Sequence, residues 1–250
     1  MNGCSTHVVL GLFLVAGCAP TAPRQGPRQG SVPELPSRTA DIADAEAGHR
    51  LAVELHRSGR IREAIEVYDR VLELEPRRAP AWRDKGLALS RAGSGEAAVR
   101  CFDAALDLEP GDVGSWNARG AVLMSLERFE DALRSFYSAT SASPEFAAGW
   151  SNRGAALLAL GRPDAAVGCY ERAIELEPGE ASFWFNKGVA LSRLERYPET
   201  LVCYERAIEL DPADPVPWRG KGEALRRLGR AEEAARCDDR ATELRARAGS

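Results

Sequence analysis

Residues 147–180 read AAGWSNRGAALLALGRPDAAVGCYERAIELEPGE, one copy of a 34-residue pattern that fills most of the chain. Counted from Ala147, the pattern has tryptophan at position 4, glycine at position 8, alanine at position 27 and proline at position 32. A fixed period of this length indicates a stack of copies of one small structural unit. Every tryptophan of the sequence keeps to this period, at Trp82, Trp116, Trp150, Trp184 and Trp218.

Each copy is predicted to form two helices, over positions 1–14 and 17–30. In the second helix of residues 147–180, Ala166, Tyr170 and Ala173 are four and three residues apart, so they share one helix face. Small residues at positions 8, 20 and 27 allow the helices to approach closely, and the aromatic residue at position 24 fills the space between them. The proline at position 32 ends the second helix. The expected fold class is therefore all-α.

This pattern resembles the tetratricopeptide repeat family. The family's W-x2-L-G-x2-Y opening appears here as W-x3-G-x2-L, and the small residues, the aromatic residue and the proline of the second half are kept. The resemblance covers about four fifths of the chain and implies a right-handed superhelical solenoid of six helix-turn-helix repeats. The expected repeats are residues 45–78, 79–112, 113–146, 147–180, 181–214 and 215–248.

A short apolar segment precedes the repeats. Residues 8–16 are apolar but too few to span a bilayer as a helix, and they lead into the string Val15-Ala16-Gly17-Cys18. This string resembles the bacterial lipoprotein box, which implies a signal peptide over residues 1–17 and acyl chains such as palmitate on Cys18. The segment departs from that pattern because no Lys or Arg precedes the apolar run. The alternative is an apolar leader with an incidental cysteine, which would leave the protein in the cytoplasm.

Residues 18–40 are predicted to be a disordered tether, because they are rich in proline, repeat the string P-R-Q-G and contain almost nothing apolar. Ala19 follows the cysteine, where an aspartate often retains lipoproteins at the inner membrane. By this resemblance, we expect a lipoprotein anchored in the outer membrane and facing the periplasm.

The composition excludes several classes of function. The formal net charge is −4, and the sequence has no basic stripe of the kind that phosphate contacts require, which argues against a nucleic-acid partner. His49 and His56 are seven residues apart, whereas zinc-binding helices place their histidines four apart. With no phosphate-binding loop or nucleophile motif either, we expect no enzyme, no metal or other cofactor and no small-molecule substrate. Four cysteines share position 23 and are predicted to be packed free thiols: Cys101, Cys169, Cys203 and Cys237.

In the proteins that this pattern resembles, the first helices of the repeats line a concave groove. The corresponding positions here are mildly apolar with scattered amides, which suits an extended or helical peptide segment of a partner protein. Hydrogen bonding between repeats is the alternative use of the amides. The expected groove residues are Leu87, Asn117, Ala121, Met124, Asn152, Ala155, Leu158, Phe185, Asn186 and Val189.

Position 7 is basic in five repeats, where the family has leucine. This cation ladder could receive an acidic partner. Alternatively, each cation pairs with an acid of a neighbouring helix, such as Glu109, Glu177 or Asp211 at position 31. The second helix of the third repeat also lacks the acid that its sister helices carry at position 25 and the arginine that they usually carry at position 26. This neutral patch is either a contact site or tolerated drift. The ladder residues are Lys85, Arg119, Arg153, Lys187 and Lys221.

Two functions follow from these features. The first is a non-catalytic protein–protein interaction scaffold or adaptor, anchored to the membrane by lipid and exposed to the periplasm. The second is a pilotin-like assembly factor, because six such repeats behind a lipoprotein box resemble the pilotin lipoproteins that help the outer-membrane secretins of type IV pili to assemble.

Overall fold

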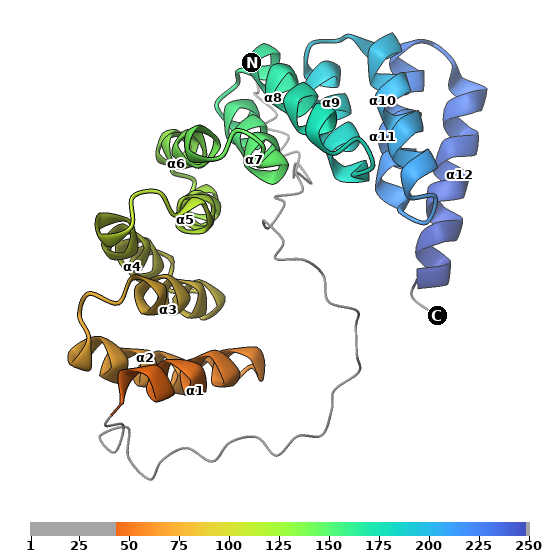
Figure 1. Cartoon of the computed structure of the whole chain (residues 1–250). Coiled ribbons are helices and arrows are strands. Elements are labelled where there is room, and N and C mark those ends of the chain that lie inside the picture. Colours follow the sequence, from red (N-terminus) through yellow and green to blue (C-terminus); the bar gives the residue numbers. More distant parts are fainter. Residues whose placement is uncertain (1–43, 249–250) are drawn as a thin grey trace, which may run out of the picture. The chain divides into compact units, whose positions relative to one another are not determined.

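The computed structural model describes residues 44–248, and all their regular structure is α-helical. The predicted signal peptide, Cys18 and the tether lie outside the described residues. The helices follow one another as pairs, and both the first and the second helix of a pair begin every 34 residues (Figure 1). They are α1 (Ala45–Arg57), α2 (Ile61–Leu74), α3 (Ala79–Arg91), α4 (Gly95–Leu108), α5 (Val113–Ser125), α6 (Phe129–Ala142), α7 (Ala147–Ala159), α8 (Pro163–Leu176), α9 (Ala181–Arg193), α10 (Tyr197–Leu210), α11 (Pro215–Arg227) and α12 (Ala231–Ala248).

The helices pack mainly against their neighbours in sequence. Within each unit, the two helices of a pair lie side by side, as α3 and α4 do, and the second helix of one pair packs against the first helix of the next, as α2 does against α3. First helices of successive pairs also touch, as α1 and α3 do. The expectation of an all-α fold built as a helical-repeat solenoid is therefore confirmed.

The described chain divides into two compact units. The N-terminal unit comprises residues 44–156 and the C-terminal unit comprises residues 157–248. Fully buried Phe102 and Phe136 lie at the centre of one core cluster of the N-terminal unit. In the C-terminal unit Leu225 and Tyr204 belong to two such clusters. Each unit thus has its own apolar core.

The glycine at position 8 packs against the aromatic ring at position 24 of the same repeat. A Cβ atom on Gly120 would lie 2.5 Å from a ring carbon of Phe136, and one on Gly188 would lie 2.6 Å from Tyr204. Both distances are far shorter than normal carbon–carbon contacts. Glycine at this position is therefore what lets the two helices of a pair approach around a large ring.

The four cysteines of the repeats are buried thiols outside any disulfide, as predicted. Burial raises the pKa of Cys203 to about 11, so its thiol stays protonated and unreactive near neutral pH. None of the helices over residues 44–248 is long and apolar enough to cross a membrane.

Candidate binding grooves

The N-terminal unit contains a groove of about 1000 Å³ that is lined mainly by first helices. Val53 on α1, Leu87 on α3 and Ala121 on α5 supply apolar walls. Leu87 is 38% exposed, which is unusual for a leucine in this protein. Phe146, directly before α7, adds an aromatic side chain. The groove thus offers a peptide an apolar surface that no described residue covers.

Polar groups lie along the same groove. Asp84 accepts a 2.9 Å hydrogen bond from Nε2 of His49 and a 3.3 Å hydrogen bond from Nε of Arg83. Burial favours the neutral form of Asp84, but these bonds prevail and hold the pKa of its carboxyl below the usual value. Burial and the nearby Arg91 lower the pKa of His56, which also lines the groove. Asp84 is therefore an ionised carboxylate and His56 a neutral imidazole at neutral pH, and the charged Arg57 and Arg91 also line the groove.

Tyr68 has a hydroxyl group with unused hydrogen-bonding capacity. Its ring is fully buried at position 24 of the first repeat, and the residue lines the groove. Among residues 44–248 the hydroxyl oxygen is buried and has no hydrogen-bond partner. A buried hydroxyl without a partner is costly, and because Tyr68 has no exposed surface, its hydroxyl is closed to a ligand. The sequence pattern marks Tyr68 only as a core residue, since periodicity does not show where the end of a long side chain lies.

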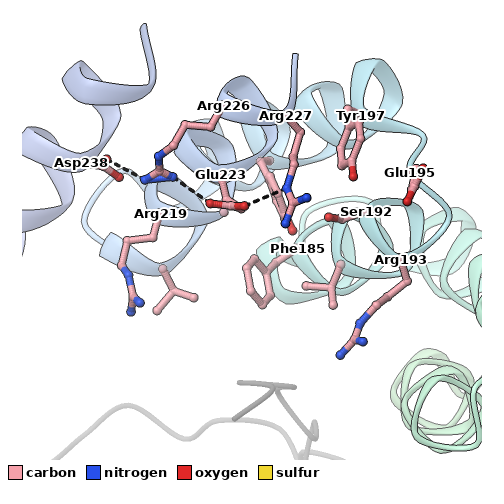
Figure 2. Close-up of a pocket in the computed structure, with 14 residues that line it drawn as sticks. Phe185, Ser192, Arg193, Glu195, Tyr197, Arg219, Glu223, Arg226, Arg227 and Asp238 are labelled. Atoms are coloured by element: carbon pink, nitrogen blue, oxygen red, sulfur yellow. Dashed lines mark hydrogen bonds and ion pairs between the residues drawn. The ribbon is translucent and has the colours of Figure 1, made fainter. Parts of the chain in front are cut away.

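The C-terminal unit has a second groove of about 790 Å³, between α9, α10 and α11. Phe185, Val189 and Val216 give it an apolar floor, and in the view of Figure 2 the ring of Phe185 lies between the side chains of Arg193 and Arg219. Both arginines are exposed and form no ion pair within the described part of the chain. The arrangement suits an apolar segment with a neighbouring acidic group.

Four other charged residues of this groove are paired with one another. Glu223 accepts hydrogen bonds from Arg226 at 2.9 Å and from Arg227 at 3.1 Å. Arg226 also donates to Asp238 at 2.8 Å. Arg193 and Arg219 are therefore the arginines of this groove that remain for a ligand. The sequence pattern missed both, because they stand at positions that vary from repeat to repeat.

Some of the predicted groove residues line a groove, and the others are partly or fully buried. Leu87, Asn117 and Ala121 line the N-terminal groove, and Phe185 and Val189 line the C-terminal groove. Met124 is half-buried and packs against the core around Phe136. The remaining four are buried: Asn152, Ala155, Leu158 and Asn186.

The buried amides include a pair that joins two repeats. Nδ2 of Asn152 on α7 donates a 2.8 Å hydrogen bond to Oδ1 of Asn117 on α5. This contact agrees with the alternative that these amides link neighbouring repeats. Asn117 also lines the N-terminal groove, so the same bond shapes part of the groove wall.

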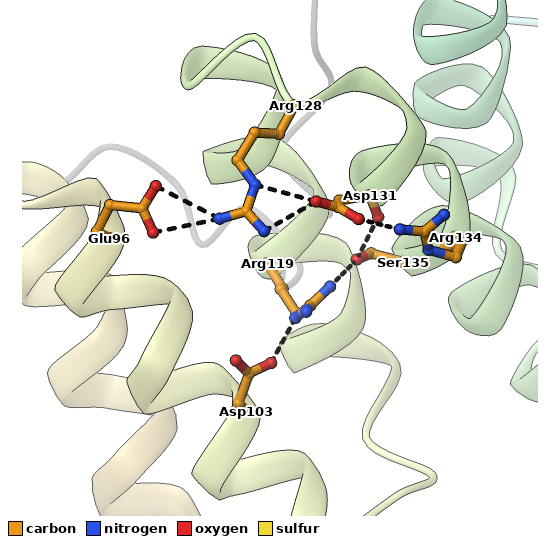
Figure 3. A network of polar contacts seen from close by, with 7 residues as sticks. All are labelled: Glu96, Asp103, Arg119, Arg128, Asp131, Arg134 and Ser135. Carbon is orange, nitrogen blue, oxygen red and sulfur yellow. Dashed lines mark hydrogen bonds and ion pairs between the residues drawn. The ribbon is translucent and has the colours of Figure 1, made fainter.

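Four of the five ladder cations are paired within the protein. Nε of Arg119 lies 2.6 Å from Oδ1 of Asp103, and its Nη1 donates to Ser135, as Figure 3 shows. The acids stand at position 25 of the preceding repeat, so the expected pairing with position 31 is wrong. Position 31 follows the last residue of the second helix, whereas position 25 is on the helix that packs against the next first helix. The pairs are Lys85–Asp69, Arg119–Asp103, Lys187–Glu171 and Lys221–Glu205.

Arg153 is the exception in this ladder. Position 25 of the preceding repeat is Tyr137, and the guanidinium of Arg153 lies 4.9 Å from the centre of that ring. It also lies 5.2 Å from the ring of Trp150. Cation–π contacts thus replace the ion pair at this position.

Comparison with known proteins agrees with this architecture. Models of the tetratricopeptide repeat match residues 54–113 and 151–215, together half of the chain. No curated protein sequence matches the chain.

Three solved structures illustrate the similarity of fold. MamA from Desulfovibrio magneticus is 22% identical, with 69% of this chain and 97% of that chain covered and a TM-score of 0.65. PilF from Pseudomonas aeruginosa is 17% identical, with 77% and 88% covered and a TM-score of 0.66. YrrB, described as a tetratricopeptide repeat protein with an unusual peptide-binding site, is 23% identical, with 72% and 93% covered and a TM-score of 0.60. With the helix pairs and the matched repeats, these similarities show that the chain belongs to the tetratricopeptide repeat family.

Proposed function

We propose that this protein is a non-catalytic scaffold that binds a peptide segment of a partner protein in the groove of its N-terminal unit. The tetratricopeptide repeat fold supports protein–protein interaction, and proteins of this family are typically non-catalytic scaffolds. The observation that carries the proposal is the exposed Leu87, which lies in one groove with the apolar Ala121 and the aromatic Phe146. The peptide-binding site named for YrrB supports the same kind of ligand.

The groove predicts the chemistry of the segment. An apolar side chain would pack against Leu87, Ala121 and Phe146. Burying one such apolar side chain contributes about 1.5–3 kcal/mol. We therefore expect one apolar anchor residue to dominate the affinity of the peptide.

Leu87→Glu tests this groove. The substitution places a charge on the apolar wall, and we expect it to weaken partner binding by roughly ten- to a hundredfold. Leu74→Glu is the matched control, because Leu74 is 37% exposed but does not line the groove. Partners would first be identified by affinity purification from envelope extract and then titrated against both variants. Equal binding by Leu87→Glu and Leu74→Glu would contradict the proposal.

We also propose that the scaffold is anchored in the outer membrane through lipid on Cys18 and faces the periplasm. The support is the string Val15-Ala16-Gly17-Cys18 after an apolar run. Metabolic labelling with palmitate should mark the wild-type protein and not Cys18→Ser. A wild-type protein without label would remove the anchor.

A pilotin-like role in secretin assembly is the second candidate. It rests on the arrangement of six repeats behind a lipoprotein box, and the likeness to PilF supports only the shared fold. Deleting the gene should then leave secretin monomers and no surface pili. Normal secretin multimers in the deletion strain would exclude this role and leave the general scaffold standing.

A further inference from the structure

Helix α6 has an uncharged surface where its sister helices carry ion pairs. In four second helices the arginine at position 26 bonds the glutamate three residues later, at N–O distances of 2.8–3.0 Å. The equivalent residues of α6 are Ser138 and Ser141, preceded by Tyr137 in place of an acid. Tyr137 is 57% exposed, although tyrosine at the neighbouring position 24 of other repeats is buried. The surface formed by Tyr137, Ser138 and Ser141 is therefore neutral and carries a large exposed ring, while Arg134 beside it is held by an ion pair with Asp131.

The neutral surface leaves one cation without a carboxylate. Arg153 forms no ion pair among residues 44–248, whereas the equivalent cations of the ladder each have one. Its Nε atom is buried and has no hydrogen-bond acceptor in the described part of the chain. Since arginine stays charged at all physiological pH values, this side chain presents a positive charge with unused hydrogen-bonding capacity.

The guanidinium of Arg153 is also held in place. It lies 4.9 Å from the centre of the Tyr137 ring and 5.2 Å from that of Trp150. Trp150 is itself fixed, because its indole N–H donates a 2.8 Å hydrogen bond to the carbonyl oxygen of Pro144. A fixed donor loses little freedom when a ligand binds, which favours affinity. The groove of the N-terminal unit is not lined by Tyr137, Trp150 or Arg153.

We propose that Tyr137, Trp150 and Arg153 form a second docking site, which binds an acidic side chain of a partner protein. The incoming carboxylate would pair with the guanidinium of Arg153, as Asp103 pairs with Arg119 in the preceding repeat at an N–O distance of 2.6 Å. An apolar residue next to the acid would pack on the exposed face of Tyr137. The occupant is thus a segment with Asp or Glu beside an apolar or aromatic residue. This site is independent of the groove, so either proposal can fail alone.

Tyr137→Asp is the decisive variant, because it restores the acid that the sister repeats carry. Its carboxylate should pair with Arg153 as Asp103 pairs with Arg119, which satisfies the cation internally without disturbing the fold. A phage-displayed library of random heptapeptides, selected on the full-length wild-type protein, should enrich peptides with Asp or Glu beside an apolar residue. We expect these peptides to bind at least tenfold more weakly to Tyr137→Asp and to Arg153→Gln.

Two control variants distinguish this site from the paired cations of the ladder and from the groove. The first control is Lys187→Gln, because Lys187 is a ladder cation that already pairs with an acid. The second is Leu87→Glu, which changes the groove of the N-terminal unit. Each variant should bind the selected peptides with an affinity within twofold of wild type. Absence of acidic residues among the selected peptides, or equal binding by Tyr137→Asp, would overturn the proposal. Self-association of the wild-type protein that Tyr137→Asp abolishes, seen by analytical ultracentrifugation, would also overturn it, because the occupant would be a second copy of this chain.

Discussion

The indole N–H of Trp116 donates a 2.8 Å hydrogen bond to the carbonyl oxygen of Pro110, six residues earlier. The same bond recurs at Trp82, Trp150 and Trp184 with distances of 2.8–3.0 Å. Each bond ties the proline that follows a second helix to the first helix of the next repeat. The tryptophans therefore order the joints between repeats as well as filling space. Trp218 differs, because its Nε1 is buried without a partner in the described residues.

This difference gives a matched pair of variants. Trp116→Phe keeps an aromatic ring and removes the bond to Pro110, so we expect it to lower the free energy of unfolding by about 1 kcal/mol. Trp218→Phe removes a similar volume but no hydrogen bond, so its loss should be smaller. Urea unfolding monitored by circular dichroism measures both. Equal losses would show that the bond contributes nothing beyond ring volume.

The turns between the two helices of each pair share one backbone requirement. Position 15 has a positive φ angle in all six repeats, for example 83° at Gly59 and 71° at Gly161. In two repeats this position is a glutamate, and Glu127 and Glu195 both have φ of 58°. Left-handed backbone is unfavourable for residues with a Cβ atom. Those two turns therefore carry strain that the glycine turns avoid.

Glu127→Gly should relieve this strain. We expect the free energy of unfolding to rise by up to about 1 kcal/mol, since the relief exceeds the greater freedom of glycine in the unfolded chain. The reverse change, Gly161→Ala, should destabilise by a similar amount. Thermal unfolding of both variants is the measurement. A lower melting temperature for Glu127→Gly would mean that its side chain contributes more than the strain costs.

Packing in this chain is local along the sequence. The helices that pack together within each unit are at most two places apart in the chain. In such arrays stability is a sum of repeat terms and nearest-neighbour terms. At the C-terminal end, α12 covers the apolar residues Leu201 and Leu225. A truncation or substitution at this end should therefore destabilise only the neighbouring helices.

Removal of residues 231–248 tests this locality. The truncated protein should lose amide protection in α11, with hydrogen exchange at least tenfold faster, because the cluster around Leu225 becomes exposed. Exchange in α1–α4 should not change, because none of these helices contacts α12. Hydrogen–deuterium exchange read by mass spectrometry reports both regions at once. Faster exchange in α1–α4 would show that the chain unfolds as one cooperative body.

Periodicity was enough to predict the helix pairs, the buried position-24 rings and the packed thiols. These features repeat in each copy, and a residue that recurs on one helix face must meet the same surroundings each time. The candidate sites were predicted only in part. Positions on the first helices were enough to predict four residues that line a groove: Leu87, Ala121, Phe185 and Val189.

The repeat period alone did not predict the contacts between side chains of different helices. Three features depend on how far apart two packed helices lie and on where the ends of side chains reach. They are the acid that pairs with each paired ladder cation, the buried hydroxyl of Tyr68 and the Asn152–Asn117 bond. A one-dimensional pattern contains positions on a helix face but no such distances, so only the packed structure shows that Arg153 lacks a carboxylate.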